Sequence, residues 1–207
     1  MLTVLSRVSP WLRHAALGAA MVGTTLVTGC ASFYVDTATK DVAATEYKVP
    51  AQPKPVQVLF EFQTKGTANA AATGMLKDQV LQQIKQSGLF SEVKTTPAEG
   101  GALLSVALNN IPLTDDAFSK GFVTGLTFGA AGSQVTDGYV CTVNYSDGSA
   151  AAPVVKTARH AIHTVLGSGG APANAVKSEG IEAAVRTMTR QIVGTALRDL
   201  STDPSFK

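Results

Sequence analysis

Residues 56–63 read Val-Gln-Val-Leu-Phe-Glu-Phe-Gln, and residues 70–86 read Ala-Ala-Ala-Thr-Gly-Met-Leu-Lys-Asp-Gln-Val-Leu-Gln-Gln-Ile-Lys-Gln. In the first stretch, apolar side chains occupy every second position, which predicts a strand with one buried face. In the second, apolar residues recur about every four positions, which predicts an amphipathic helix that ends at Gly88. This change of period predicts a strand followed by a helix in one folded domain.

The downstream sequence contains further periodic segments of both kinds. Apolar alternation predicts strands at 89–93 and 104–108, and a hairpin of 139–145 and 154–166 around the turn residues Asp147 and Gly148. After the glycine-rich stretch 167–170, a helical pattern extends from about 173 to 200. The order strand, helix, strand, strand, hairpin, helix predicts an α+β fold, with a mainly antiparallel sheet and two amphipathic helices packed on one face.

The N-terminal region has the pattern of a secretory leader. Arg7 and Arg13 precede an apolar stretch at 15–27, and the sequence Leu-Val-Thr-Gly-Cys occupies 26–30. An ordinary signal peptide cut nearby and an uncleaved membrane helix are the alternatives. A spanning helix needs about 20 apolar residues, whereas 15–29 is shorter and rich in Ala, Gly and Thr.

The stretch 26–30 resembles the lipobox of bacterial lipoproteins. The resemblance implies cleavage between Gly29 and Cys30, a diacylglycerol on the Cys30 sulfur and an acyl chain such as palmitate on the new amino terminus, with no other cofactor. It also implies attachment to the outer membrane at its periplasmic face, because Ala31 and Ser32 stand where inner-membrane members often carry aspartate. We therefore expect a leader at 1–29, a lipid-anchored tether at 30–55 and a periplasmic α+β domain at 56–207.

The tether is expected because 31–55 shows little apolar periodicity and ends in Pro50, Pro53 and Pro55. The alternative is a segment that packs on the domain, using aromatic residues within it. Those residues are Phe33, Tyr34 and Tyr47.

Loss of the leader makes the mature chain formally neutral. The leader holds two of the 17 basic residues and none of the 15 acidic ones, so the mature chain gives no reason to expect a nucleic-acid partner. Cys30 and Cys141 are the two cysteines, and lipidation of the first excludes an intrachain disulfide. Cys141 falls on the apolar face of its strand, which predicts a buried and unreactive thiol.

The sequence holds no recognisable catalytic motif. His160 and His163 are three residues apart, and such residues point to opposite faces of a strand, so a shared metal ion is not expected. Asp115 and Asp116 could hold a cation together with Asp137, but solvated or capping acids are commoner. We therefore expect a protein that is not an enzyme and has no metal site.

Residues 121–133 form an uncharged segment with four glycines and two phenylalanines. Burial in the core is one interpretation, and an exposed apolar surface for a partner or a membrane is another. A third is half of a membrane-spanning hairpin in an oligomeric pore. The candidate contact residues are Phe122, Val123, Leu126 and Phe128.

The element order, with the pieces 88–93 and 145–148, resembles the small α+β domains of cell-envelope lipoproteins. Examples are the amino-terminal domain of TolB, LpoB and CsgG, and the stretch 125–129 is similar to uncharacterised envelope lipoproteins. The resemblance implies a periplasmic interaction or assembly module that binds another envelope protein through 121–133 and a sheet edge, with a homo-oligomer possible. The alternatives are a subunit of an oligomeric export channel and a carrier of an apolar ligand.

Overall fold

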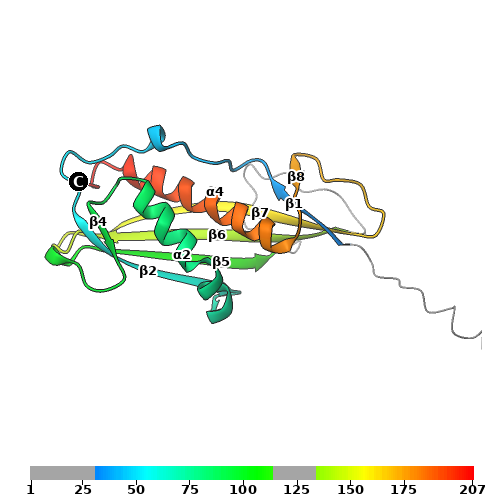
Figure 1. Ribbon diagram of the computed structural model, residues 1–207, viewed down its shortest axis with the longest axis horizontal. Coiled ribbons are helices and arrows are strands. Elements are labelled where there is room, and N and C mark those ends of the chain that lie inside the picture. The colour runs from blue at the N-terminus through cyan, green and yellow to red at the C-terminus, as the bar shows by residue number, and fades with distance from the viewer. Residues whose placement is uncertain (1–30, 114–133) are drawn as a thin grey trace, which may run out of the picture. The chain divides into compact units, whose positions relative to one another are not determined.

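The computed structural model describes residues 31–113 and 134–207, which belong to one folded unit (Figure 1). Its two helices and eight strands are joined by irregular segments and by two short 3₁₀ turns, η1 (Ala44–Glu46) and η2 (Glu99–Gly101). The strands are β1 (Ala31–Asp36), β2 (Pro55–Thr64), β3 (Thr67–Ala68), β4 (Glu92–Lys94), β5 (Leu103–Pro112), β6 (Gln134–Ser146), β7 (Val154–Leu166) and β8 (Ala175–Lys177), and the helices are α2 (Ala70–Gln86) and α4 (Ile181–Ser201).

All eight strands form one sheet in the order β3-β2-β5-β6-β7-β1-β8, with β4 beside β2. The pairs of β2 with β4 and with β5 are parallel, and the other pairs are antiparallel. A parallel pair needs a crossover, which α2 supplies between β2 and β5. The fold is therefore a mixed α/β arrangement with a largely antiparallel sheet, as the sequence predicts, although strands outweigh helices.

Both helices lie on one face of the sheet (Figure 1). In β2, alternate side chains are buried under the helices, while those between them are partly or fully exposed on the other face. The buried set joins the inner faces of α2 and α4 in one hydrophobic core. Its fully buried large members include Leu76, Ile84, Leu104, Leu108, Ile162, Met188, Ile192, Leu197 and Leu200.

The predicted tether is wrong for residues 31–55. Residues 31–36 form β1, which lies between β7 and β8 and buries Tyr34, Val35 and Asp36. The chain then crosses the helical layer to reach β2 at the other side of the sheet (Figure 1). On the way Tyr47 packs against the core and the Lys48 N–H donates to Ser201 Oγ at 3.1 Å. The folded unit therefore begins next to Cys30 and not at residue 56.

Two other boundaries differ from the prediction. Helix α4 begins at Ile181 and not near 173, because 175–177 pair with β1 as β8 and Gly180 occupies the N-cap in an extended conformation. The strand predicted at 89–93 is β4 at 92–94, since Leu89 and Phe90 form a bend whose side chains are buried. Neither helix in the described part of the chain is long and apolar enough to cross a membrane.

Candidate functional site

The principal predicted site residues lie outside the described part of the chain. These are Gly29 and Cys30 of the lipobox, the candidate contact residues Phe122, Val123, Leu126 and Phe128, and the acids Asp115 and Asp116. Their roles stay predictions. Asp137, the third acid of that group, is half-buried on β6, and burial raises the pKa of its carboxyl while a hydrogen bond with Asn110 opposes the shift.

The two histidines of β7 point to opposite faces of the sheet, as their spacing predicts. His160 lies on the helical side, where its Nε2 is 2.7 Å from Oε1 of Gln191 in α4. Its Nδ1 accepts from the Ala161 N–H at 2.8 Å, which assigns the ring as a neutral Nε2–H tautomer. Burial of the ring lowers the pKa of His160, and the hydrogen bond with Gln191 acts in the other direction.

His163 belongs to a second buried polar group, on the face away from the helices. Its Nε2 lies 3.4 Å from Asp36 Oδ2 in β1, and its Nδ1 lies 3.0 Å from Thr136 Oγ1 in β6. The other Asp36 oxygen accepts from the Ala38 N–H at 2.7 Å. His163 and Asp36 are almost completely buried, so this group ties three adjacent strands together through hydrogen bonds in a place without solvent.

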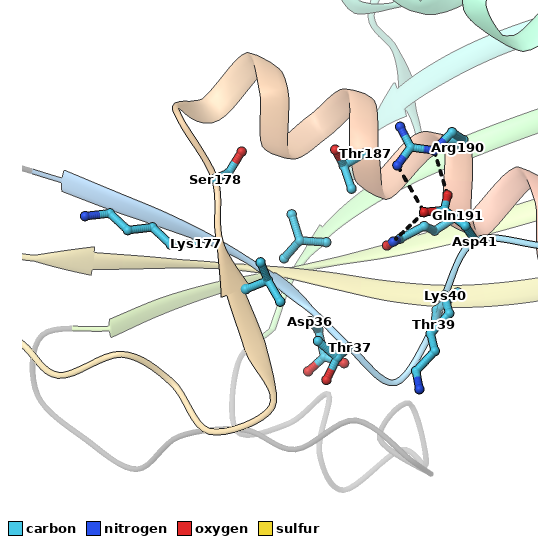
Figure 2. A pocket seen from close by; sticks show the side chains of 12 residues that line it. Asp36, Thr37, Thr39, Lys40, Asp41, Lys177, Ser178, Thr187, Arg190 and Gln191 are labelled. Atoms are coloured by element: carbon cyan, nitrogen blue, oxygen red, sulfur yellow. Dashed lines mark hydrogen bonds and ion pairs between the residues drawn. The ribbon is translucent and has the colours of Figure 1, made fainter.

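A polar pocket of about 280 Å³ lies between β1, β8, α4 and the segment after β1 (Figure 2). On one side, Asp41 receives two hydrogen bonds from Arg190, at 2.6 and 3.1 Å, and one from Gln191 at 3.5 Å. The bonds from Arg190 hold the pKa of Asp41 below its usual range, while partial burial opposes them. Because Gln191 also meets His160, one network joins the crossing segment, α4 and β7.

The pocket offers hydrogen-bonding groups and charges of both signs to a ligand. Its other polar lining comes from the Asp36 carboxylate and from hydroxyl and ammonium groups, namely Thr37, Thr39, Lys40, Lys177, Ser178 and Thr187. Among residues 31–113 and 134–207, no three His, Cys, Asp or Glu side chains gather as metal ligands would. Cys141 is fully buried, and burial raises the pKa of its thiol to about 12, so it is no nucleophile.

A second, wider pocket of about 460 Å³ lies at the opposite end of α4, beside the C-terminus. The exposed Val49 and the buried Phe206 line it together with three lysines, Lys48, Lys54 and Lys207. Lys54 is 3.9 Å from Asp147, a loose pair of two half-exposed side chains. Exposed pairs of this kind contribute little to stability. The three lysines make this end of the unit rich in charged side chains.

The sheet face turned away from the helices is exposed toward the β6–β7 hairpin turn, and we call this part the open face; the part that holds Tyr34, Ala161 and His163 is buried. On this face Leu59 of β2 and Val155 of β7 are about half exposed, at 48% and 51%, and they lie in one row of paired residues with Ser105 and Asn144. The sheet also has two edge stretches, 58–62 of β2 and 154–161 of β7, which pair with no described strand on their outer side. The contact surface expected at a sheet edge therefore stays a prediction, beside a contact on the open face.

Sequence reasoning missed the groups that meet at the polar pocket. Asp41 and Arg190 are 149 residues apart, and His160 and Gln191 are on different elements. No motif or spacing links such residues. The available signal was Arg190 on the polar side of a predicted helix, which is also the ordinary place for a solvated arginine.

Comparison with known proteins identifies no family. No family model and no curated protein sequence matches the chain. Two crystal forms of the PelC dodecamer from Paraburkholderia phytofirmans align at 14% and 15% identity, with TM-scores of 0.36 and 0.34. They cover 84% and 83% of this chain and 100% and 96% of the PelC chains. A proposed lipoprotein from Caulobacter crescentus aligns at 9% identity over 70% of this chain and 84% of its own, with a TM-score of 0.26. Likenesses at these scores carry no argument about this chain.

Proposed function

We propose that this chain is a lipid-anchored cell-envelope protein whose folded domain is a non-catalytic interaction or assembly module at the periplasmic face of the outer membrane. The observation that carries the proposal is the stretch 26–30, which ends in Cys30 directly before the folded unit. In this proposal residues 1–29 are removed, and Cys30 holds a diacylglycerol and an N-terminal acyl chain. The bilayer is then one partner, and another envelope protein is the second.

The described part of the chain supports a binding role through its surface. The open sheet face carries the exposed Leu59 and Val155 among small, polar and charged side chains. These include Ala107, Thr142, Asn144, Glu61 and Arg159. Leu59 and Val155 are three strand spacings apart, about 14 Å, so a partner that contacts both spans β2 to β7. The segment with Phe122 and Phe128 remains the other candidate contact, as predicted from its composition.

The first test is crosslinking in intact envelopes, with the full-length protein and its Cys30→Ala variant run in parallel. We expect one envelope protein to be captured with the native chain and lost with Cys30→Ala, because the variant cannot be lipidated. Capture that does not depend on Cys30 would contradict the anchored module. A regular ladder of self-crosslinks would favour an export channel, and copurifying acyl chains would favour a carrier of apolar ligands.

A second test separates the open face from the rest of the surface. We expect the double variant Leu59→Asp, Val155→Asp to lose the captured partner while keeping its circular dichroism spectrum, since both side chains are half exposed. The matched control is Val49→Asp, whose side chain is 49% exposed but lies at the wider pocket on the helical side. Equal loss in both variants would contradict a contact on the open face.

A further inference from the structure

Strands β6, β7 and β1 reach the same end of the sheet, whereas β5 and β2 stop short of it, since Pro112 pairs with Asp137 and Thr64 pairs with Asn110. β5 is parallel to β2 and antiparallel to β6, β6 is antiparallel to β7, and β7 is antiparallel to β1. The first residue of β1, Ala31, pairs with the last residue of β7, Leu166, and Gln134 at the start of β6 pairs with Val165. We call the end of the sheet that holds Ala31, Val135 and Leu166 the anchor end.

The anchor end is adjacent to the predicted lipid attachment in the chain itself. Cys30 and Ala31 are consecutive, and a trans peptide bond keeps neighbouring Cα atoms about 3.8 Å apart. The polar headgroup layer of each leaflet is about 5–7 Å thick. The first paired residue of the sheet follows the lipidated residue directly. This end of the sheet must therefore lie at the headgroup layer.

The exposed side chains at this end suit a lipid surface. Val135 and Leu166 are about half exposed, at 53% and 49%, and Val176 and Ile181 are also large exposed apolar residues near the same end. The chain from 165 to 176 carries no charged residue, and most of 166–174 is exposed. Lys177 and Glu179, of opposite charge, border this stretch.

The opposite end of the sheet has the reverse character. Three ion pairs lie there, between Lys54 and Asp147, Lys94 and Glu92, and Lys156 and Asp203. Among the described residues, the uncharged stretch 165–176 at the anchor end contrasts with these ion pairs, and such a stretch suits contact with a bilayer.

We infer that the anchor end of the sheet is a membrane-contact surface, on which Val135, Leu166 and the uncharged segment 165–176 rest in the headgroup layer. This inference rests on the proposed lipidation of Cys30. The occupant is the lipid bilayer, and the contact fixes the strands upright on it, with the hairpin turn at Gly148 and the wider pocket turned toward the periplasm. The open sheet face then stands perpendicular to the membrane and accessible to a partner.

Site-specific fluorescence on the full-length lipidated protein tests this orientation. Single cysteines at Val135→Cys and Leu166→Cys receive an environment-sensitive probe, and the protein is placed in phosphatidylethanolamine and phosphatidylglycerol vesicles with nitroxide-labelled headgroups. Lipid occupies the Cys30 sulfur and Cys141 is fully buried, so each variant has one reactive thiol. The matched controls are Val155→Cys, with Val135, and Val49→Cys, with Leu166, since each pair has nearly equal exposure.

We expect a blue shift and loss of fluorescence at Val135→Cys and Leu166→Cys, and neither at the controls. Along β7, Val155 is nine residues from Thr164, the partner of Val135, which places it about 30 Å further from the anchor. Quenching at no site, or equally at all four, in protein that carries lipid would overturn the orientation. Mass spectrometry of the same sample tests the proposed lipidation separately. An unmodified Cys30 would contradict the lipid anchor and with it this membrane-contact surface.

Discussion

Gly148 lies in the turn between β6 and β7 with a φ of +83°, in the left-handed region that favours glycine. A Cβ there would collide with the carbonyl oxygen of Gly100 and lie 2.9 Å from the carbonyl carbon of Gly101. Both obstacles are backbone atoms, which cannot rotate away as a side chain can. We expect Gly148→Ala to lower the free energy of unfolding by more than about 2 kcal/mol, measured by urea denaturation.

The control for Gly148→Ala is Gly167→Ala. Gly167 also has a positive φ, +66°, but nothing lies within 4 Å of the point where an alanine would place its Cβ. Only the conformational cost remains there, about 1–2 kcal/mol at most. A Gly148 variant no less stable than the Gly167 variant would contradict the close approach of the 100–101 turn.

His160 should make the stability of the domain depend on pH. Burial lowers its pKa in the folded state below the ordinary value of 6.5, so the folded ring binds a proton less readily than the unfolded ring does. Because the unfolded state binds more protons below pH 6.5, stability falls as the pH drops through that value, by up to about 1.4 kcal/mol per unit.

The measurement compares wild type with His160→Gln in urea at pH 7.5, 6.5 and 5.5. We expect the free energy of unfolding to fall more steeply with decreasing pH for wild type than for His160→Gln. This difference in slope is expected whether or not the two proteins are equally stable at pH 7.5. The remaining titratable groups are common to both proteins and cancel in the comparison. If the free energy of unfolding falls equally with pH in both proteins, protonation of His160 does not destabilise the folded state.

Strand β1 moves the start of the folded domain from the predicted residue 56 to Ala31. It contributes Tyr34 and Val35 to the buried residues, and β8 joins the sheet through it. Each fully buried large apolar side chain contributes about 1.5–3 kcal/mol, which is a sizeable share of a total of about 5–15 kcal/mol. We expect a chain of residues 31–207 to unfold cooperatively on heating, and a chain of residues 56–207 to show no cooperative transition. Similar melting of both chains by circular dichroism would restore the boundary at 56.

The elements that were predictable are those whose pattern is local. Helix α2 covers 70–86 and β7 covers 154–166, as the apolar periods indicate, because each packs a periodic set of its side chains into the core. β1 and β8 have six and three residues, too few to establish a period, and their partners are distant in sequence. Ala173 and Ala175 are good helix formers before α4, but pairing of 175–177 with β1 overrides the helical propensity of alanine.

The same distinction applies to the candidate sites at the scale of the whole molecule. The spacing of His160 and His163 was enough to predict opposite faces, and the apolar register of Cys141 was enough to predict a buried thiol. The polar pocket was not predictable, because Asp41 meets Arg190 only after the chain crosses the helical layer. The anchor end was likewise hidden, since it depends on where β1 begins and on which strands end beside it.

Because β1 follows Cys30 without a tether, the proposed anchor holds the folded unit at a fixed height above the membrane. A longer connection between Cys30 and Ala31 should release the anchor end from the headgroup layer. A flexible linker of about 12 Gly and Ser residues between Cys30 and Ala31 spans about 20 Å on average, well beyond a headgroup layer of about 5–7 Å. We expect the lipidated insertion variant to stay in the membrane fraction and to keep its free energy of unfolding, because β1 still begins at Ala31. A probe at Leu166→Cys should nevertheless lose its headgroup quenching.

The same linker inserted after Ala150, in the exposed loop between β6 and β7, controls for the added length. That loop is at the end of the sheet away from Ala31, so quenching at Leu166→Cys should persist. Persistent quenching with the linker at Ala31 would mean that the anchor end binds lipid without help from a short connection, against this prediction. Loss in the first variant and retention in the second would make the position of Cys30, one residue before the sheet, the determinant of how the open face is presented to its partner.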